Sequence, residues 1–199
     1  MARTVGADAP PRTRLPAIVL TGAPATGKST VGRLLARRLQ AALIDQDVAA
    51  GPLVEVIQRL VGIDDLDDER LAGLTRAARY EAIAALAIDN LTARVPVVLV
   101  APYTRELADD RAWTELASRL LAAGGRPLLV WLSLEPEQIL RRLQARDASR
   151  DRAKLADAGA FLAGLTQRVV RPAVPHLPLA ADQPHEVLVH QILDAVKLP

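Results

Sequence analysis

The sequence predicts a three-layer α/β/α sandwich, in which helices cover both faces of a five-stranded parallel sheet. Short apolar runs alternate along the chain with segments whose apolar residues recur at helical spacing, which is typical of βα units. The runs are apolar throughout, as strands buried on both faces are. With 199 residues, 50% hydrophobic and 24% charged, the chain has the composition of one globular domain. We expect this domain at residues 15–199, after a flexible segment at 1–14.

The first predicted strand is the apolar run at 15–21, which leads into a Gly-rich turn. A second strand is expected at 42–45. Between them, a helix is predicted from apolar residues at helical spacing, namely Val31, Leu34, Leu35 and Leu39.

A helical region is expected between the second and third strands. It comprises a short helix at 51–62 and a long one at about 67–94, opened by acidic residues that suit a helix N-terminus. Pro96 closes it, and the apolar run at 97–101 predicts the third strand.

The second half of the chain repeats the alternation of strand and helix. A helix carries Trp113, Leu116 and Leu120 on one face and ends at two glycines. The remaining expected elements are a strand at 128–132, a helix from Pro136, an Arg-rich lid at 145–158, a helix at 152–164, a strand at 176–179 and a helix at 184–196.

A phosphate-binding motif lies between the first strand and the first helix. The eight residues 22–29 satisfy the pattern G-x-x-x-x-G-K-[ST] in the strand-to-helix context that this motif requires. Glycines let backbone N–H groups turn toward phosphates, and the helix N-terminus adds a positive dipole. The plain alternative is a Gly-rich turn that caps a helix. The expected nucleotide-binding residues are Gly22, Ala23, Pro24, Ala25, Thr26, Gly27, Lys28, Ser29 and Thr30.

Within this motif, Lys28 would neutralise phosphate charge and Ser29 would offer its hydroxyl to Mg²⁺. Asp45 and Asp47 stand two apart at the end of the second strand. Alternation in an extended segment predicts that both side chains lie on the same side. One carboxylate can then orient Mg²⁺ and the other can accept a proton from a hydroxyl, whereas the alternative is two solvated loop acids.

Two absences weigh against motor and switch proteins. The third strand ends at Ala101 without the carboxylate that such proteins use to hold Mg²⁺ or polarise water. The only asparagine, Asn90, is followed by Leu91, so the guanine-reading pattern Asn-Lys-x-Asp is missing.

The phosphate motif and the acids after the second strand resemble the P-loop small-molecule kinases, such as shikimate kinase, gluconate kinase and chloramphenicol phosphotransferase. The resemblance implies Mg·ATP as cofactor and transfer of the γ-phosphate to a hydroxyl of a small molecule. The Asp-x-Asp pattern of shikimate kinase implies that Asp45 lies near Mg²⁺ and that Asp47 is the base. Its glycine triplet after the third strand is replaced here by residues 101–105, so shikimate is not implied as the acceptor.

The same resemblance gives roles to the arginines that follow the fourth strand. An R-x-x-x-R step like that of adenylate kinases implies that Arg142 stacks on adenine and Arg146 meets phosphate, while Arg150 or Arg152 approaches the transferring phosphoryl group. Arginine suits these tasks because its planar guanidinium stacks on bases and grips phosphate oxygens. The alternative is that these arginines lie on a solvent-exposed helix and form ion pairs with neighbouring aspartates. The loop that ends at Pro184 is expected against adenine.

The acceptor is expected against the helices of residues 51–94 and the loop after the third strand. Asp47, as the candidate base, is expected to contact it. The other candidate residues, each equally consistent with a surface position, are Arg76, Arg79, Tyr80, Tyr103 and Arg105.

The composition of the chain bears on whether it binds nucleic acid, forms disulfides or spans a membrane. With 25 basic and 23 acidic residues, the net charge of +2 does not favour nucleic-acid binding. No cysteine is present, and no apolar run is long enough to span a bilayer. We therefore expect a cytoplasmic monomer or homodimer with a small-molecule acceptor. A regulatory ATPase without an acceptor and a nucleic-acid-associated ATPase remain as rivals.

Overall fold

A five-stranded, all-parallel sheet forms the centre of the computed structural model, which describes residues 13–63, 68–146, 155–159, 161, 164 and 172–197. The spatial order of the strands is β2-β3-β1-β4-β5, and each neighbouring pair runs parallel. The predicted fold class is confirmed. The strands are β1 (Leu15–Gly22), β2 (Ala42–Asp45), β3 (Val97–Val100), β4 (Gly125–Ser133) and β5 (Leu177–Ala180).

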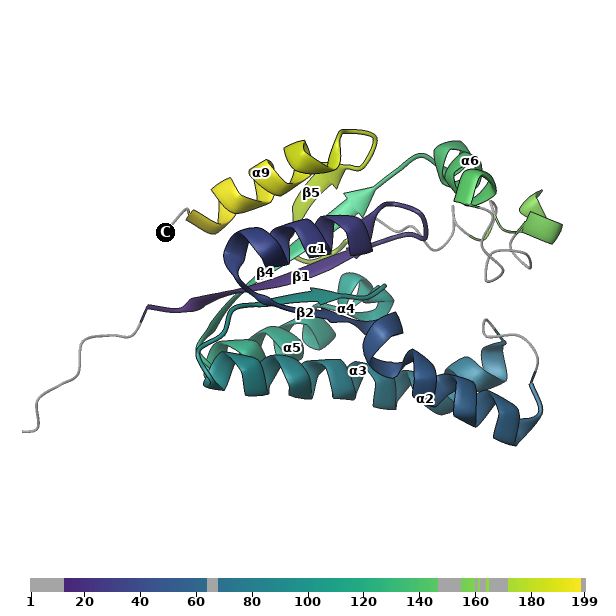
Figure 1. The fold of residues 1–199 in the computed structure, drawn as a ribbon, viewed down its shortest axis with the longest axis horizontal. Helices are drawn as coiled ribbons and strands as arrows, with labels where there is room; N and C mark the ends of the chain where they lie inside the picture. The colour runs from purple at the N-terminus through teal and green to yellow at the C-terminus, as the bar shows by residue number, and fades with distance from the viewer. Residues whose placement is uncertain are drawn as a thin grey trace, which may run out of the picture.

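Helices lie on both faces of this sheet (Figure 1). On one face are α1 (Lys28–Leu39) and α9 (His185–Lys197), and on the other are α3 (Glu69–Thr92) and α5 (Asp110–Ala122). The remaining described helices are α2 (Gln46–Val61), α4 (Thr104–Ala108) and α6 (Pro136–Arg146). No helix in the described part of the chain is both long and apolar enough to cross a membrane.

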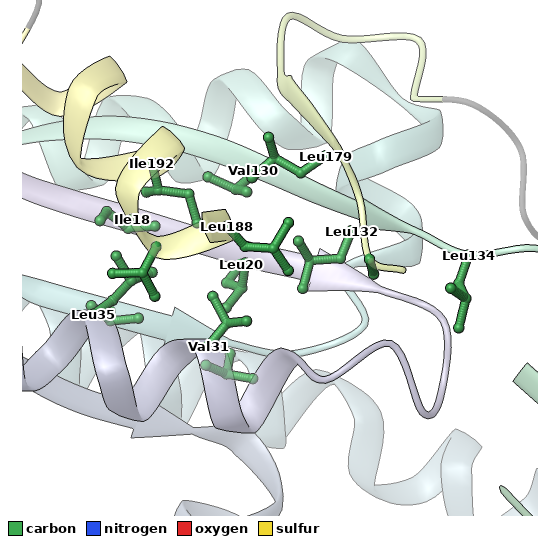
Figure 2. Close-up of a cluster of buried hydrophobic side chains, with 14 of the residues drawn as sticks. Ile18, Leu20, Val31, Leu35, Val130, Leu132, Leu134, Leu179, Leu188 and Ile192 are labelled. Carbon is green, nitrogen blue, oxygen red and sulfur yellow. The ribbon is translucent and has the colours of Figure 1, made fainter. Parts of the chain in front are cut away.

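The hydrophobic core is divided into two clusters by the sheet. Successive side chains of a strand point to opposite faces, so Ile18 and Leu20 of β1 join the cluster beneath α1 and α9, while Ala17 and Val19 join the other. Figure 2 shows the first cluster, where β1 and β4 side chains meet those of α1 and α9. Burial on both faces explains why the strands read as continuous apolar runs.

Strand register brings the phosphate motif and the first acid to one edge of the sheet. Asp45 is level with Val100 of β3, and Val100 is level with Leu20 of β1, two residues before Gly22. Because the strands are parallel, their carboxyl ends share this edge, which is where ligands bind in open α/β sheets.

Two helices differ from the sequence expectations. The helix expected at 51–62 begins at Gln46, because the Asp45 carboxylate accepts the Asp47 N–H and caps the new helix. Pro52 lies inside α2. The short helix α4 was not expected. Most of the expected lid at 145–158 lies outside the described residues. Of the helix expected at 152–164, the described residues are 155–159, 161 and 164, and all of these except Asp157 are helical.

Candidate functional site

The phosphate loop, residues 22–29, follows β1 and runs into α1. Gly22 has φ +148° and Gly27 has φ +89°, which are left-handed values that other residues rarely adopt. A Cβ at Gly22 would also collide with the carbonyl oxygen of Leu132. Glycine is therefore required at both positions by backbone conformation and by close packing.

Side chains within the phosphate loop hold its shape. Thr26 is buried, and its hydroxyl donates to the Ala23 carbonyl at 2.9 Å. Lys28 Nζ donates to the same carbonyl at 2.7 Å, so its ammonium group lies across the loop. Thr30, one residue beyond the loop, is exposed on α1. The loop thus combines a fixed backbone, a cation and a helix N-terminus, the features of a phosphate-binding site.

Ser29 and Asp45 meet, although they come from different βα units. The Ser29 hydroxyl donates to Asp45 Oδ2 at 2.7 Å, and Asp45 is only 8% exposed. A hydroxyl beside a carboxylate is the hard oxygen donor set that Mg²⁺ prefers, and Mg²⁺ commonly takes few protein ligands together with water and phosphate oxygens. The described residues contain no group of three or more His, Asp or Glu that could hold a metal alone. The pair fits Mg²⁺ carried with a nucleotide.

Asp47 has different surroundings from those that the sequence suggested. The extended alternation of Asp45 and Asp47 is wrong, because the strand ends at Asp45 and Asp47 is the second residue of α2. Its side chain is 65% exposed, and its Oδ1 lies 3.6 Å from Arg79 Nη2. The first acid is thus fixed at the phosphate loop, whereas the second faces solvent beside an arginine from α3.

Gln46 is a site residue that the sequence reasoning missed. It is 2% exposed, and its Oε1 accepts a hydrogen bond from Arg79 Nη2 at 2.9 Å. Its Nε2 and Arg79 Nε are buried without a hydrogen-bond partner among the described residues, which is uncommon for buried polar atoms. A polar residue between two acids at a strand end was the available signal.

The two candidate tyrosines belong to the packed interior. Tyr103 is 1% exposed and has φ +44°, and its N–H donates to the Tyr80 hydroxyl at 3.0 Å. Their rings meet edge to face at 5.4 Å, and burial raises the pKa of both hydroxyls. The pair therefore fixes the loop after β3. Arg105, on α4, is exposed.

Arg142 joins two loops. Its Nη2 donates to the Ala181 carbonyl at 2.8 Å, and its Nη1 donates to the Ala25 carbonyl at 3.4 Å. Arg146 ends α6 and is exposed, and Pro184 is exposed just before α9. Arg150 lies outside the described residues.

His185, the first residue of α9, was also missed. A Cβ on Gly27 would lie 2.8 Å from its Nε2, so the imidazole ring occupies the space beside the phosphate loop. The preceding proline had drawn attention to the loop, but nothing in the sequence separated His185 from the other two histidines.

Comparisons with known proteins agree with this architecture. Residues 18–170 match the AAA_33 family model, described as an AAA domain. No curated protein matches the sequence. Similar solved structures include a candidate kinase from Chloroflexus aurantiacus J-10-fl, with TM-score 0.66, 19% identity, and coverage of 94% of this chain and 98% of that one.

Two further structures are similar over nearly the whole chain. A gluconokinase from Sinorhizobium meliloti 1021 gives TM-score 0.57 and 20% identity, covering 93% of each chain. The APS kinase CysC of Mycobacterium tuberculosis, in complex with AMPPNP and APS, gives TM-score 0.59 and 18% identity, covering 94% of this chain and 100% of that one. These likenesses show a P-loop kinase fold.

Proposed function

The chain belongs to the AAA_33 family of AAA domains, and we propose that it is an ATP-dependent phosphotransferase that moves the γ-phosphate of Mg·ATP to a hydroxyl of a small molecule. The observation that carries this proposal is the 2.7 Å contact between Ser29 and Asp45, with Asp47 two residues further on. It joins a phosphate loop to one acid that suits Mg²⁺ and to a second, solvent-facing acid. The kinases among the similar structures support the same reaction class.

The nucleotide side of the site is assigned to the phosphate loop and its neighbours. Backbone N–H groups of the loop and Lys28 would bind the β- and γ-phosphates, while Ser29 and Asp45 would hold Mg²⁺. Bound there, Mg²⁺ neutralises charge on the phosphate oxygens. Arg142 and Pro184 are proposed at the adenine end, and Arg146 and Arg150 near the phosphates.

Asp47 is the proposed base. The acceptor oxygen forms a bond to the γ-phosphorus, the bond from that phosphorus to the bridging oxygen breaks, and ADP leaves. The hydroxyl proton passes to the Asp47 carboxylate. Its exposure supports this role, because a substrate hydroxyl can come within hydrogen-bond reach of an exposed carboxylate.

The acceptor side of the proposal rests on Arg79 and Arg105. Arg79 contacts both Gln46 and Asp47, so it lies beside the proposed base. Tyr80 and Tyr103 remain acceptor candidates from the resemblance, but with Tyr103 buried they would act by shaping the loop that carries Arg105. We propose a cytoplasmic monomer or homodimer that does not act on nucleic acid.

The deciding experiment incubates the protein with Mg²⁺, γ-labelled ATP and pools of hydroxylated metabolites and antibiotics. A labelled small product would establish the reaction and identify the acceptor. Consumption of ATP at the same rate with every pool, without a labelled product, would instead favour a regulatory ATPase.

A further inference from the structure

One guanidinium connects the two loops expected at opposite ends of the nucleotide. Arg142 is half-buried on α6, and it donates to Ala25 in the phosphate loop and to Ala181 in the β5–α9 loop, residues 181–184. Both donors lie in the plane of the guanidinium, so the two bonds fix its orientation. A lysine ammonium could not reproduce this planar bridge, because its three donors radiate from one atom.

The contact falls on a strained residue. Ala25 has φ +60°, a left-handed conformation that is unfavourable for an L-residue with a Cβ. Such a conformation persists only where the surroundings hold it in place. Thr26 and Lys28 both bond the carbonyl of Ala23. Arg142 bonds the carbonyl of Ala25 itself, so it contacts the one non-glycine residue of this loop whose φ is positive.

His185 makes a second connection between the same two segments. Its ring lies against Gly27, at the N-cap of α1, where any Cβ would approach its Nε2 to 2.8 Å. Contacts to the phosphate loop are therefore made at both ends of the β5–α9 loop. Arg142 contacts its first residue, Ala181, and His185, the residue that follows it, packs against Gly27.

We propose that Arg142 and His185 are positioning residues that form a clamp, which fixes the spacing between the phosphate loop and the β5–α9 loop before a nucleotide binds. A ligand that spans both loops then binds without first having to order them, and this preorganisation raises its affinity. The clamp rests on the proposed nucleotide binding at the phosphate loop. Its ligand class is a nucleoside triphosphate whose base end reaches the β5–α9 loop.

The test uses Arg142→Met and His185→Ala, with Arg141→Met as the matched control, because Arg141 is an exposed neighbour on α6. Amide hydrogen exchange is measured first on nucleotide-free protein. Arg142→Met should exchange about ten-fold faster in both loops, the size expected from losing hydrogen bonds to a charged group. His185→Ala, which removes the ring packed against Gly27, should also exchange faster in both loops. The control should match the wild type, and Arg142→Lys should restore little of the protection.

Calorimetry then compares Mg²⁺ complexes of a non-hydrolysable ATP analogue and of tripolyphosphate, which needs only the phosphate loop. In each clamp variant the affinity ratio of the analogue to tripolyphosphate should fall by about ten-fold. The double variant should lose less binding free energy for the ATP analogue than the two single variants lose together, since both residues hold the same loop.

Unchanged exchange in nucleotide-free Arg142→Met would overturn the clamp, even if its ATP affinity fell, because Arg142 would then act only by touching the nucleotide. The clamp would also be overturned if its variants lost the same amount of affinity for the ATP analogue and for tripolyphosphate. If the wild type bound neither ligand, the proposed function would fail, whereas the exchange measurement would still decide whether the clamp exists.

Discussion

Asp45 and Asp47 illustrate how neighbouring residues of one type acquire different chemistry. Asp45 is nearly buried, accepts hydrogen bonds from Ser29 Oγ and Asp47 N–H, and so has a fixed orientation. Asp47 is exposed and pairs at 3.6 Å with Arg79. A metal-orienting carboxylate benefits from rigidity and a base from access, so the local structure favours the order of roles proposed here.

Replacing Asp47 by Asn should lower the turnover of the phosphotransferase reaction by about 10²–10⁴-fold, because general base catalysis contributes on that scale. Affinity for Mg·ATP should stay within about three-fold of the wild type, since Asp47 is not assigned to the nucleotide. Steady-state kinetics and calorimetry measure the two effects. The surface substitution Asp89→Asn is the control, and wild-type turnover in Asp47→Asn would remove this residue from the mechanism.

Glu106 should make stability depend on pH. Burial raises its pKa above the ordinary value of 4.5, so the folded protein binds this proton more tightly than the unfolded chain. Its contribution is fully present below pH 4.5 and is lost as pH rises through the folded-state pKa. Glu106→Gln, which stays neutral, should therefore gain stability relative to the wild type across this interval. Urea unfolding from pH 4 to 8 measures the difference, and a constant difference would contradict the prediction.

At the scale of elements, Gly32 sets how closely α1 approaches the sheet. A Cβ at this position would lie 2.7 Å from Val100 Cγ2 of β3 and 3.3 Å from a Leu43 methyl group. Val100 is β-branched and buried, so its side chain cannot easily change rotamer to make room for a Cβ. The close fit of helix and strand depends on the missing side chain.

Gly32→Ala should consequently destabilise the protein by about 1–3 kcal/mol through overpacking, despite the better helix propensity of alanine. Gly73→Ala is the matched control, since no atom lies within 4 Å of its would-be Cβ on α3, and it should stabilise by about 0.5–1 kcal/mol. Chemical denaturation of both variants provides the comparison. Equal stabilisation by the two substitutions would show that α1 has room to move.

Most elements could be predicted from the sequence, for reasons visible in the packing. Every strand was found, because burial on both faces produces an unbroken apolar run. The start of α2 was expected five residues too late, because the helix is capped by the Asp45 carboxylate directly at the end of the strand. The short helix α4 begins after Tyr103, whose left-handed backbone depends on a hydrogen bond to α3.

The candidate site was less accessible to sequence reasoning. The phosphate loop could be predicted from its sequence pattern, and Asp45 could be predicted from its place after an apolar run. Gln46 offered only its place between two acids and His185 offered no pattern, since both make their contacts with residues distant in sequence, Arg79 and Gly27. The scarcity of aromatic residues made Tyr103 a candidate, but scarcity does not distinguish a pocket from a core.

At the scale of the whole molecule, binding of Mg·ATP should stabilise the fold. At about 100 times its dissociation constant, a ligand adds about 2.7 kcal/mol, which corresponds to a rise in Tm of about 5–10 °C for a chain of this size. A chelator should remove most of this rise in the wild type. In Ser29→Ala the chelator should have little left to remove, because the Ser29–Asp45 oxygen pair is broken. A large chelator effect in that variant would place the metal elsewhere.

The position of β1 also has a consequence for biosynthesis. Although β1 is near the N-terminus, it is the central strand and lies between β3 and β4. Its pairing with β4 uses residues up to Leu132, so β1 is flanked on both sides only after the chain has been synthesised beyond this residue. Non-local parallel pairing is slow. The apolar run that ends in the phosphate loop is therefore left without its neighbouring strands until β3 and β4 have been made, and exposed apolar surface of this kind makes an incomplete chain prone to aggregation.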